Sequence, residues 1–225
     1  MANKVLAGVA DRVFTAFPNV FRKAQWVGNP LRAEFLNQPD PVTRFAGRSG
    51  PLHLLVVGGS LGAKALNEVV PQALALLPKE QRPRVLHQSG ATQIDALRAN
   101  YQAAGVVAEL TPFIDNTAQA FADADLVICR AGASTVTEIA AVGAAAVFVP
   151  FPSAVDDHQT TNARFLADNG GGRVLLQRDL TAAALAEILQ KQERNTLMAQ
   201  GLAAKKMQKT GATEAVVAAC EELSA

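Results

Sequence analysis

Two glycine-rich segments of this 225-residue chain are the first candidates for chemistry. Residues 58–63 (GGSLGA) and residues 130–138 (RAGASTVTE) each follow a short apolar run. Glycines let a backbone approach a ligand closely, and free N–H groups at the start of a helix favour an anion. The spacing in 58–63 matches neither the dinucleotide fingerprint nor the lysine-bearing P-loop. A tight turn that binds nothing therefore remains the alternative to a phosphate site.

Three polar side chains add to this pattern. Arg130 could pair with phosphate, and Glu138 could accept hydrogen bonds from a ribose diol. A capping box formed by Thr135 and Glu138 is an equally good interpretation of the second segment. Gln159 follows a further apolar run, in the first turn of an expected helix that Asp156 or Asp157 could cap. An amide at that place could bind sugar hydroxyls.

These candidates occur at regular places in an alternation of strands and helices. The alternation predicts an α/β fold, in which right-handed crossovers join parallel strands and helices cover both faces. Ligands of such sheets bind at the carboxyl ends of the strands. Pro71 should kink or divide the first helix. We expect strands at 52–57, 84–87, 106–110, 126–129, 145–149 and 174–176, and helices at 62–77, 91–104, 116–122, 135–142, 158–167 and from 181 onward, with breaks near 195 and 211.

The strand-end rule also excludes several residues. Asp123 and Asp125 resemble a metal-binding D-x-D pattern, but they precede a strand and we reject them. Residues 170–172, three glycines, also precede a strand and read as a helix end. His53 and His87 lie within expected strands and should be structural.

Composition excludes further classes of protein. A net charge of +1 argues against a nucleic-acid binder, and a hydrophobic content of 49% argues against disorder. The two cysteines, Cys129 and Cys220, are far apart, which favours a reducing compartment. No export signal is visible, and the most apolar stretch, 139–152, is interrupted and too short to span a membrane. We therefore expect a cytoplasmic protein.

Five segments together resemble the MurG family of bacterial peptidoglycan glycosyltransferases: residues 29–32, 56–63, 113–115, 129–138 and 157–163. The resemblance covers essentially the whole chain. It implies a GT-B architecture, in which two Rossmann-like domains face each other across a cleft. It also implies transfer of N-acetylglucosamine from UDP-N-acetylglucosamine to lipid I, forming lipid II. The reaction would be inverting and would use no metal and no cofactor.

The same resemblance implies a division of the chain. The first fifty residues do not continue the strand–helix alternation, and a helix at 4–13, strands at 13–17 and 25–28 and a Pro-rich stretch at 37–50 are expected there. The chain looks like the C-terminal part of a longer enzyme. We expect a remnant of an acceptor domain at 1–30, a hinge at 31–50, the UDP-sugar-binding domain at 51–211 and a helix at 212–225 that packs on the acceptor domain.

The resemblance assigns the donor contacts residue by residue. Gly59, Ser60 and Gly62 would hold the pyrophosphate, and Ile114 would offer backbone hydrogen bonds to uracil with Phe113 packed nearby. Leu61 stands where the family commonly has glutamine, which affects a side-chain contact but not the backbone cradle. The remaining implied contacts are Glu138 with the ribose, Arg130 near the phosphates, Ala133, Ser134, Thr135, Val136 and Thr137 along the phosphate side, Gln159 with the glucosamine hydroxyls, and Arg32 at the hinge.

The general base would belong to the acceptor domain, so we expect this chain to bind the donor with little or no turnover. Lipid I and the inner face of the plasma membrane would be partners of the full-length enzyme. Two alternatives share the donor: a UDP-sugar-binding subunit of a split transferase, and a UDP-N-acetylglucosamine epimerase. An oxidoreductase would bind NADH instead, and the glycine spacing argues against it.

Overall fold

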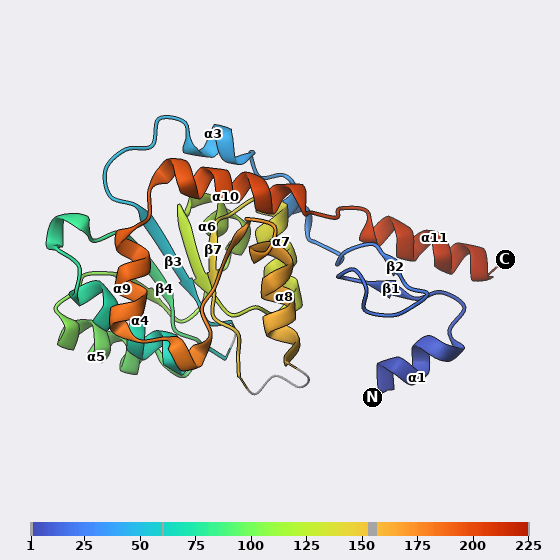
Figure 1. Cartoon of the computed structure of the whole chain (residues 1–225), viewed down its shortest axis with the longest axis horizontal. Helices are drawn as coiled ribbons and strands as arrows, with labels where there is room; N and C mark the ends of the chain where they lie inside the picture. The colour runs from blue at the N-terminus through green and yellow to red at the C-terminus, as the bar shows by residue number, and fades with distance from the viewer. Residues whose placement is uncertain (1, 60, 153–156, 225) are drawn as a thin grey trace.

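The computed structural model describes residues 2–59, 61–152 and 157–224, and its main body is a six-stranded parallel sheet (Figure 1). The strand order is β5-β4-β3-β6-β7-β8, so the direction of winding changes between β3 and β6. In α/β sheets, ligands bind in the crevice at such a switch point. The predicted α/β fold is confirmed. The strands are β3 (His53–Val57), β4 (Arg84–Gln88), β5 (Glu109–Thr111), β6 (Leu126–Cys129), β7 (Ala146–Phe148) and β8 (Gly172–Val174).

Both faces of the sheet are buried at its centre, because the central strands β3, β6 and β7 are almost entirely apolar. Successive side chains of a strand point to opposite faces. Accordingly, Leu54 and Val56 of β3 belong to one buried cluster, and Leu55 and Val57 belong to the other. The first cluster includes α4 (Lys64–Ala75), α5 (Ile94–Ala104) and α9 (Ala182–Gln190), and the second includes α6 (Thr117–Asp123), α7 (Ala133–Val142) and α8 (His158–Ala167).

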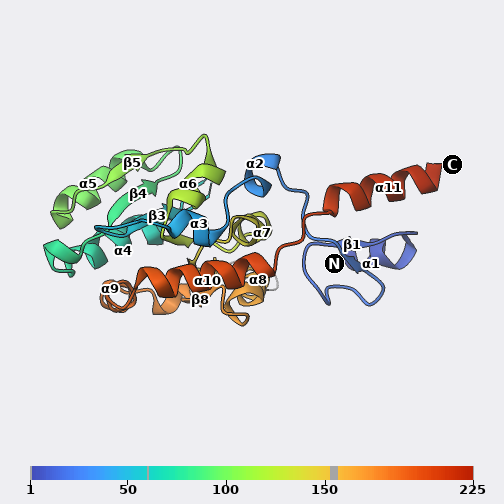
Figure 2. The same cartoon turned by 90° about the horizontal axis from the view of Figure 1, so that it is seen from above.

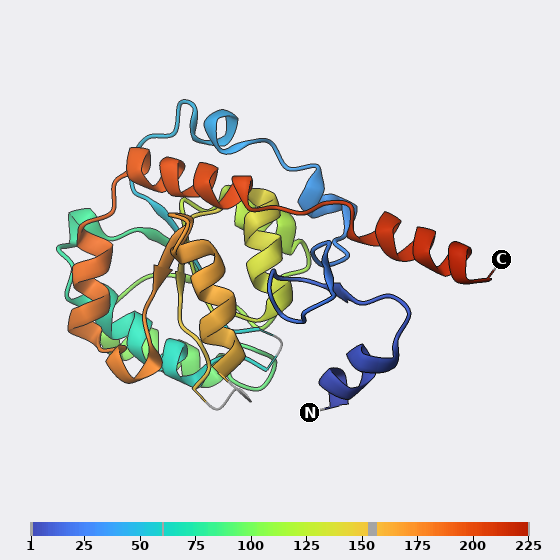
Figure 3. The ribbon, with the colours of Figure 1, turned by 45° about the vertical axis from the view of Figure 1, so that its right-hand side comes forward.

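The amino ends and the carboxyl ends of the strands, which we call the amino edge and the carboxyl edge of the sheet, are covered differently. In Figure 3, helix α10 (Arg194–Lys206) runs across the edge where the strands begin, with α3 (Pro41–Phe45) beside it. Both helices lie at the amino edge. The carboxyl edge carries the loops that follow β3, β6 and β7, and these hold most of the candidate residues.

The ends of the chain lie to one side of this body (Figure 2). They are joined to it through the Trp26 ring, which packs edge-to-face on Phe165 with 5.7 Å between ring centroids. The Lys209 ammonium lies 4.5 Å from the centroid of the same tryptophan. These end segments are α1 (Ala2–Val9), the parallel strands β1 (Phe14–Thr15) and β2 (Gln25–Trp26), and α11 (Ala212–Ser224).

The stretch expected as a hinge contains short helices. Besides α3 it holds α2 (Ala33–Leu36), whose Phe35 is fully buried in the second cluster. Asp40 caps α3, because its carboxylate accepts a hydrogen bond from the Thr43 N–H at 3.0 Å. Pro41 follows at the first helical position, which proline favours. Composition alone suggested a linker here, whereas the chain is packed.

Helix α4 continues through Pro71, so of the two predicted outcomes, a kink or a division, the division is wrong. A proline has no N–H to offer the carbonyl four residues before it, which here is that of Asn67. The side-chain amide of Asn100 on α5 donates to this carbonyl oxygen at 3.0 Å instead. A neighbouring helix therefore satisfies the acceptor that Pro71 leaves unpaired.

Two strands are displaced from their predicted positions. β5 begins at Glu109 rather than 106, because Gly105 ends α5 in a left-handed conformation and the Val106 N–H bonds back to Tyr101 O at 3.2 Å. β8 begins at Gly172, two residues early. A Cβ at Gly172 would lie 2.5 Å from Ala146 O, so only glycine lets this strand approach β7.

Candidate functional site

A cavity of about 680 Å³ opens at the carboxyl ends of β3, β6 and β7. It borders the switch point between β3 and β6, where the two glycine-rich segments meet. The predicted residues that line it are Gly59, Gly62, Arg130, Thr135 and Gln159. The strand-end rule thus selected five residues that the structure brings together around one cavity.

The glycines of the first segment have different tasks. Gly59 has φ +83°, and a Cβ there would meet nothing within 4 Å. Gly62 has φ +75°, but a Cβ there would lie 2.0 Å from Ser89 O. The Gly62 N–H donates to Gly59 O at 2.9 Å and closes the turn. Gly59 thus leaves room on the cavity side, whereas Gly62 is required by packing within the protein. Ser60 lies outside the described residues.

Two helices begin at the cavity without a side-chain cap. The N-cap residues are Ala63 for α4 and Gly132 for α7, and neither makes a side-chain capping bond. The first N–H groups of each helix lack helical partners, so both ends favour an anion. Because α7 starts at Ala133, Thr135 is already inside its first turn. The capping-box alternative for Thr135 and Glu138 is therefore wrong.

Lys64 is a cavity residue that the sequence reasoning missed. It is the first residue of α4, and its ammonium lies 3.7 Å from the Glu68 carboxylate, which also lines the cavity. Its side chain is largely exposed, so the charge is available to an anion that enters the cavity. A cation directly after a glycine loop was the sequence signal for it.

The Arg130 guanidinium is held by the protein. It donates to Val149 O at 3.0 Å, to Pro150 O at 3.2 Å and to Gln177 Oε1 at 2.7 Å, and it lies over the Phe151 ring. Burial lowers the pKa of this half-buried group. Arg130 therefore secures the loop after β7 and adds positive charge to the cavity wall.

Gln159 joins the loops that follow β6 and β7. Its Oε1 accepts from the Ala131 N–H at 3.2 Å and from the Phe151 N–H at 2.9 Å, which leaves the amide N–H groups for other partners. One turn later on α8, the buried Asn162 donates to Ala131 O at 3.1 Å. Asn162 lies three residues after Gln159, a spacing that puts both amides on one face of a helix, and this was the sequence signal for it. Asp157 occupies the N-cap position but accepts from the Thr160 hydroxyl rather than from backbone, and Asp156 lies outside the described residues.

A second group of predicted residues is not part of the cavity wall. Burial raises the pKa of the half-buried Glu138 carboxyl, and the charge of Arg32 opposes this rise. Arg32 lines a separate hollow together with Asp115. Phe113 is 60% exposed, and the carbonyl of Ile114 accepts from the Thr117 hydroxyl at 3.3 Å.

The helix residues 133–137 differ among themselves. Val136 is fully buried in the core, and Ser134 is exposed. The Thr137 hydroxyl bonds to Ala133 O and Ser134 O within α7 and accepts from the Asn29 side chain at 3.1 Å. Of this run, Thr135 alone is a described lining residue of the cavity.

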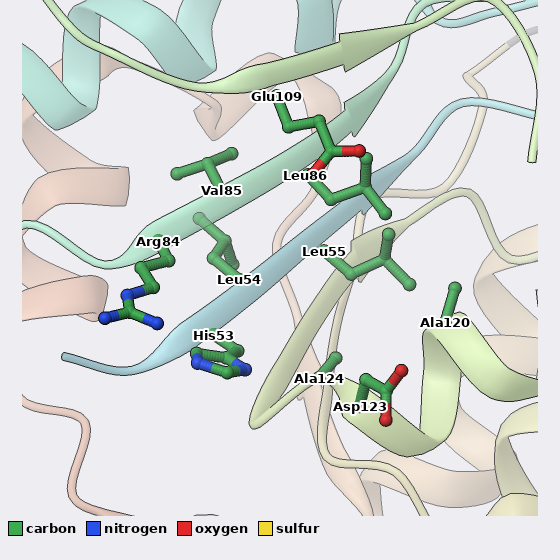
Figure 4. Close-up of a pocket in the computed structure, with 10 residues that line it drawn as sticks. All are labelled: His53, Leu54, Leu55, Arg84, Val85, Leu86, Glu109, Ala120, Asp123 and Ala124. Carbon is green, nitrogen blue, oxygen red and sulfur yellow. The ribbon is translucent and has the colours of Figure 1, made fainter. Parts of the chain in front are cut away.

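A different hollow, of about 240 Å³, lies toward the amino ends of β3 and β4 beside α6 (Figure 4). Leu55 and Leu86 line it, with Arg84 and His53 at one end. Asp123 also lines it, and its carboxylate accepts from the Gln119 amide. It lacks a glycine loop and a helix N-terminus, so we do not assign it as the functional site.

Comparison with known proteins gives consistent matches. Residues 53–219 match the glycosyltransferase family 28 C-terminal domain. The whole chain is 78% identical over 224 residues to the UDP-N-acetylglucosamine–N-acetylmuramyl-(pentapeptide) pyrophosphoryl-undecaprenol N-acetylglucosamine transferase of Polaromonas sp. (strain JS666), of which it covers 58%. It is 73% identical to the protein of the same name from Paracidovorax citrulli, of which it covers 63%.

Solved structures agree. The crystal structure of Acinetobacter baumannii MurG matches 99% of this chain with a TM-score of 0.89 and 40% identity, and the match covers 63% of that chain. The calicheamicin glycosyltransferase CalG4, at 20% identity and a TM-score of 0.54, shares the fold. The chain thus spans about three fifths of the length of the MurG relatives that it matches.

Two kinds of feature are absent from the described residues. No three side chains of the metal-ligating types gather in one place there. None of the helices described in the structure has the length and apolar character needed to cross a membrane.

Proposed function

The chain belongs to glycosyltransferase family 28 through its C-terminal domain, and from this premise we propose that it binds UDP-N-acetylglucosamine in the 680 Å³ cavity. The donor follows from the names of the relatives. The observation that carries the proposal is the pair of uncapped helix starts, at Ala63 and Gly132, on either side of one cavity.

In this proposal the diphosphate lies between the starts of α4 and α7. Their free N–H groups and the Lys64 ammonium stabilise the negative charge, each helix end contributing on the order of 0.3–1 kcal/mol. Gly59 lets the backbone come close, and Ser60 adds a hydroxyl. The amide N–H groups of Gln159 bind the sugar hydroxyls.

The nucleoside lies on the side of Phe113, Ile114 and Glu138. The Glu138 carboxylate accepts hydrogen bonds from the ribose hydroxyls, and Arg32 keeps positive charge near it. In the free protein this carboxylate is half-buried, and burial raises its pKa. Two ribose hydroxyls would restore the hydrogen bonds that burial withholds, which favours binding.

In the whole protein, the reaction is an inverting transfer of N-acetylglucosamine to lipid I, which forms lipid II at the cytoplasmic face of the inner membrane. The donor half stabilises the leaving UDP through helix starts and cations, without a metal. An acceptor hydroxyl also needs a general base. We assign that base to the two fifths of the relatives that this chain does not match, and we expect little turnover by the chain alone.

Calorimetric titration with UDP-N-acetylglucosamine tests donor binding, with UDP-N-acetylgalactosamine and NADH as controls. Selective binding of the first, weakened by Glu138→Ala and Gln159→Ala, supports the proposal. Gln119→Ala on the exposed face of α6 is the matched control and should bind as the wild type does. A folded wild-type sample that binds no UDP-sugar contradicts the assigned cavity. Lipid II formation by the isolated chain contradicts the assignment of the base.

A further inference from the structure

Leu61 and Gly62, which close the first glycine loop, are supported from behind by the turn that follows β4. In that turn Gly90 has φ +86°, and a Cβ there would lie 2.5 Å from Gly62 N. Beside it, the Gln93 side-chain amide donates to Leu61 O at 2.9 Å. Backbone packing and one side-chain hydrogen bond therefore determine where the loop lies.

Gln93 is the outer end of a buried polar chain. Its Oε1 accepts from Asn67 Nδ2 at 3.0 Å, and the same nitrogen donates to Ser89 O at 3.1 Å. Asn67 Oδ1 lies 3.1 Å from His87 Nε2, and His87 Nδ1 lies 3.0 Å from the Tyr101 hydroxyl. Asn67, His87 and Tyr101 are all at most 3% exposed.

The donors and acceptors in this chain all run in one direction. Asn67 Nδ2 donates twice, so Oδ1 is the acceptor and His87 Nε2 carries the proton. His87 Nδ1 is then the acceptor of the Tyr101 O–H. Burial favours the neutral form of the ring over the charged one, since it lowers the pKa of His87 to about 3. From Tyr101 to Leu61 O each group donates to the next, and such chains strengthen their members.

We propose that Gln93, Asn67 and His87 are positioning residues that hold the glycine loop in the shape required by the donor diphosphate. The inference rests on the proposed function of this cavity. A buried polar chain is not needed to fill the core here, because apolar side chains of the same shape would do so at little cost. A buried polar chain in which every group is paired specifies a single arrangement of its members. The chain described above ends on Leu61 O, so the arrangement that it specifies includes the glycine loop.

The test uses Gln93→Met, which removes both hydrogen bonds at similar side-chain length and adds no charge. Gln102→Met, on the exposed part of α5, is the matched control. Amide hydrogen exchange of Gly62 reports on the loop without any ligand. NMR titrations with UDP and with uridine separate diphosphate binding from nucleoside binding.

We expect Gln93→Met to raise the Gly62 exchange rate and to weaken UDP binding, each roughly fivefold, as for one lost hydrogen bond, with uridine binding within about twofold. Tyr101→Phe, which cuts the chain at its far end, should change both values in the same direction but less. A folded Gln93→Met protein with unchanged Gly62 exchange overturns the inference, and so does an equal loss of UDP and uridine binding. Failure of the wild type to bind UDP would refute the proposed function instead. The Gly62 exchange rate, which is measured without ligand, would still show whether Gln93 holds the loop in place.

Discussion

The two edges of the main sheet both carry charged residues, but they use them differently. At the amino edge the buried Asp125 carboxylate pairs with Arg48 at 2.7 Å and Arg194 at 3.3 Å, and it accepts from the His53 N–H at 2.9 Å. At the carboxyl edge, the Lys64 side chain remains largely exposed, and the half-buried Glu138 carboxyl has no hydrogen-bond partner among the described residues. The Asp125 charge is neutralised within the fold, whereas the charges of Lys64 and Glu138 are available to a ligand.

Arg44 shows how completely the amino edge is occupied. Its guanidinium donates to Pro39 O, to Ala122 O near the end of α6, and to Val142 O and Gly143 O at the end of α7. Burial lowers the pKa of Arg44 to about 10, so it stays charged at neutral pH. A cation at two helix ends offsets the partial negative charge of their carbonyls. The comparison predicts that substitutions at the amino edge reduce stability, and those at the carboxyl edge reduce binding.

The largest expected effect is at the amino edge. Arg44→Ala removes the donors of several buried carbonyls, and we expect a loss of about 3–5 kcal/mol in the free energy of unfolding. Arg98→Ala on exposed α5 should cost under about 0.5 kcal/mol. Urea unfolding measures both. UDP-N-acetylglucosamine affinity of the folded Arg44→Ala fraction should not change, and a clear loss there would break the separation of the edges.

Two glycines of one loop sharpen the comparison within the carboxyl edge. Gly62→Ala forces a Cβ to within 2.0 Å of Ser89 O, so backbone must move and we expect a loss of roughly 2–4 kcal/mol in stability. Gly59→Ala meets open space, so only the strain of a positive φ remains, about 1–2 kcal/mol.

The order of the two substitutions should be reversed when UDP affinity is measured instead of stability, because Gly59 faces the proposed diphosphate. Relative to its stability loss, Gly59→Ala should therefore show the greater loss of UDP affinity, measured by calorimetry on samples checked by thermal unfolding. Equal ratios of binding loss to stability loss in the two variants would contradict the different tasks of these glycines.

Glu138→Gln separates binding from stability. The folded protein raises the pKa of this carboxyl, so the ionised form is disfavoured by folding and the amide should leave stability equal or higher at neutral pH. UDP binding should fall roughly tenfold or more, as expected when a charged hydrogen-bond acceptor is lost. Wild-type affinity should also decrease as the pH falls through the raised pKa, a dependence that the variant lacks. Thermal unfolding and titrations between pH 4 and 7 measure these effects.

The effect expected to be smallest at neutral pH, and to grow only on acidification, concerns the interior behind the glycine loop. His87 has its pKa lowered from 6.5 to about 3 in the folded state. Below pH 6.5 His87 is protonated in the unfolded chain but stays neutral in the folded one. The contribution of neutral His87 to the free energy of unfolding is therefore fully present above pH 6.5 and is lost as the pH falls toward 3. The loss approaches about 1.4 kcal/mol per pH unit. Unfolding of His87→Gln at several pH values should show a shallower slope than the wild type, and equal slopes would contradict a neutral buried His87.

Local patterns in the sequence determined much of this molecule. The strand Leu126–Cys129 and the helix His158–Ala167 have the predicted bounds, since an apolar run between polar residues and a helical spacing are signals that neighbours in the chain carry. The alternation of such elements specifies a parallel sheet, and a parallel sheet specifies which strand ends meet. The glycine-rich segments after β3 and β6 could therefore be placed at the same end of the sheet before any contact was known, and the observed strand order makes them neighbours.

Only the tertiary structure decided what individual residues do there. Gly59 and Gly62 look alike in sequence, yet one faces a cavity and the other faces Ser89, in the turn that follows β4. The acceptor that Pro71 leaves unpaired is satisfied by Asn100, and the chain from Tyr101 to Leu61 joins two helices, a strand and a loop. The physical reason is the same in each case. A periodic pattern reports which side of an element is apolar, but a hydrogen bond or a close approach depends on atoms that the chain brings together from far apart.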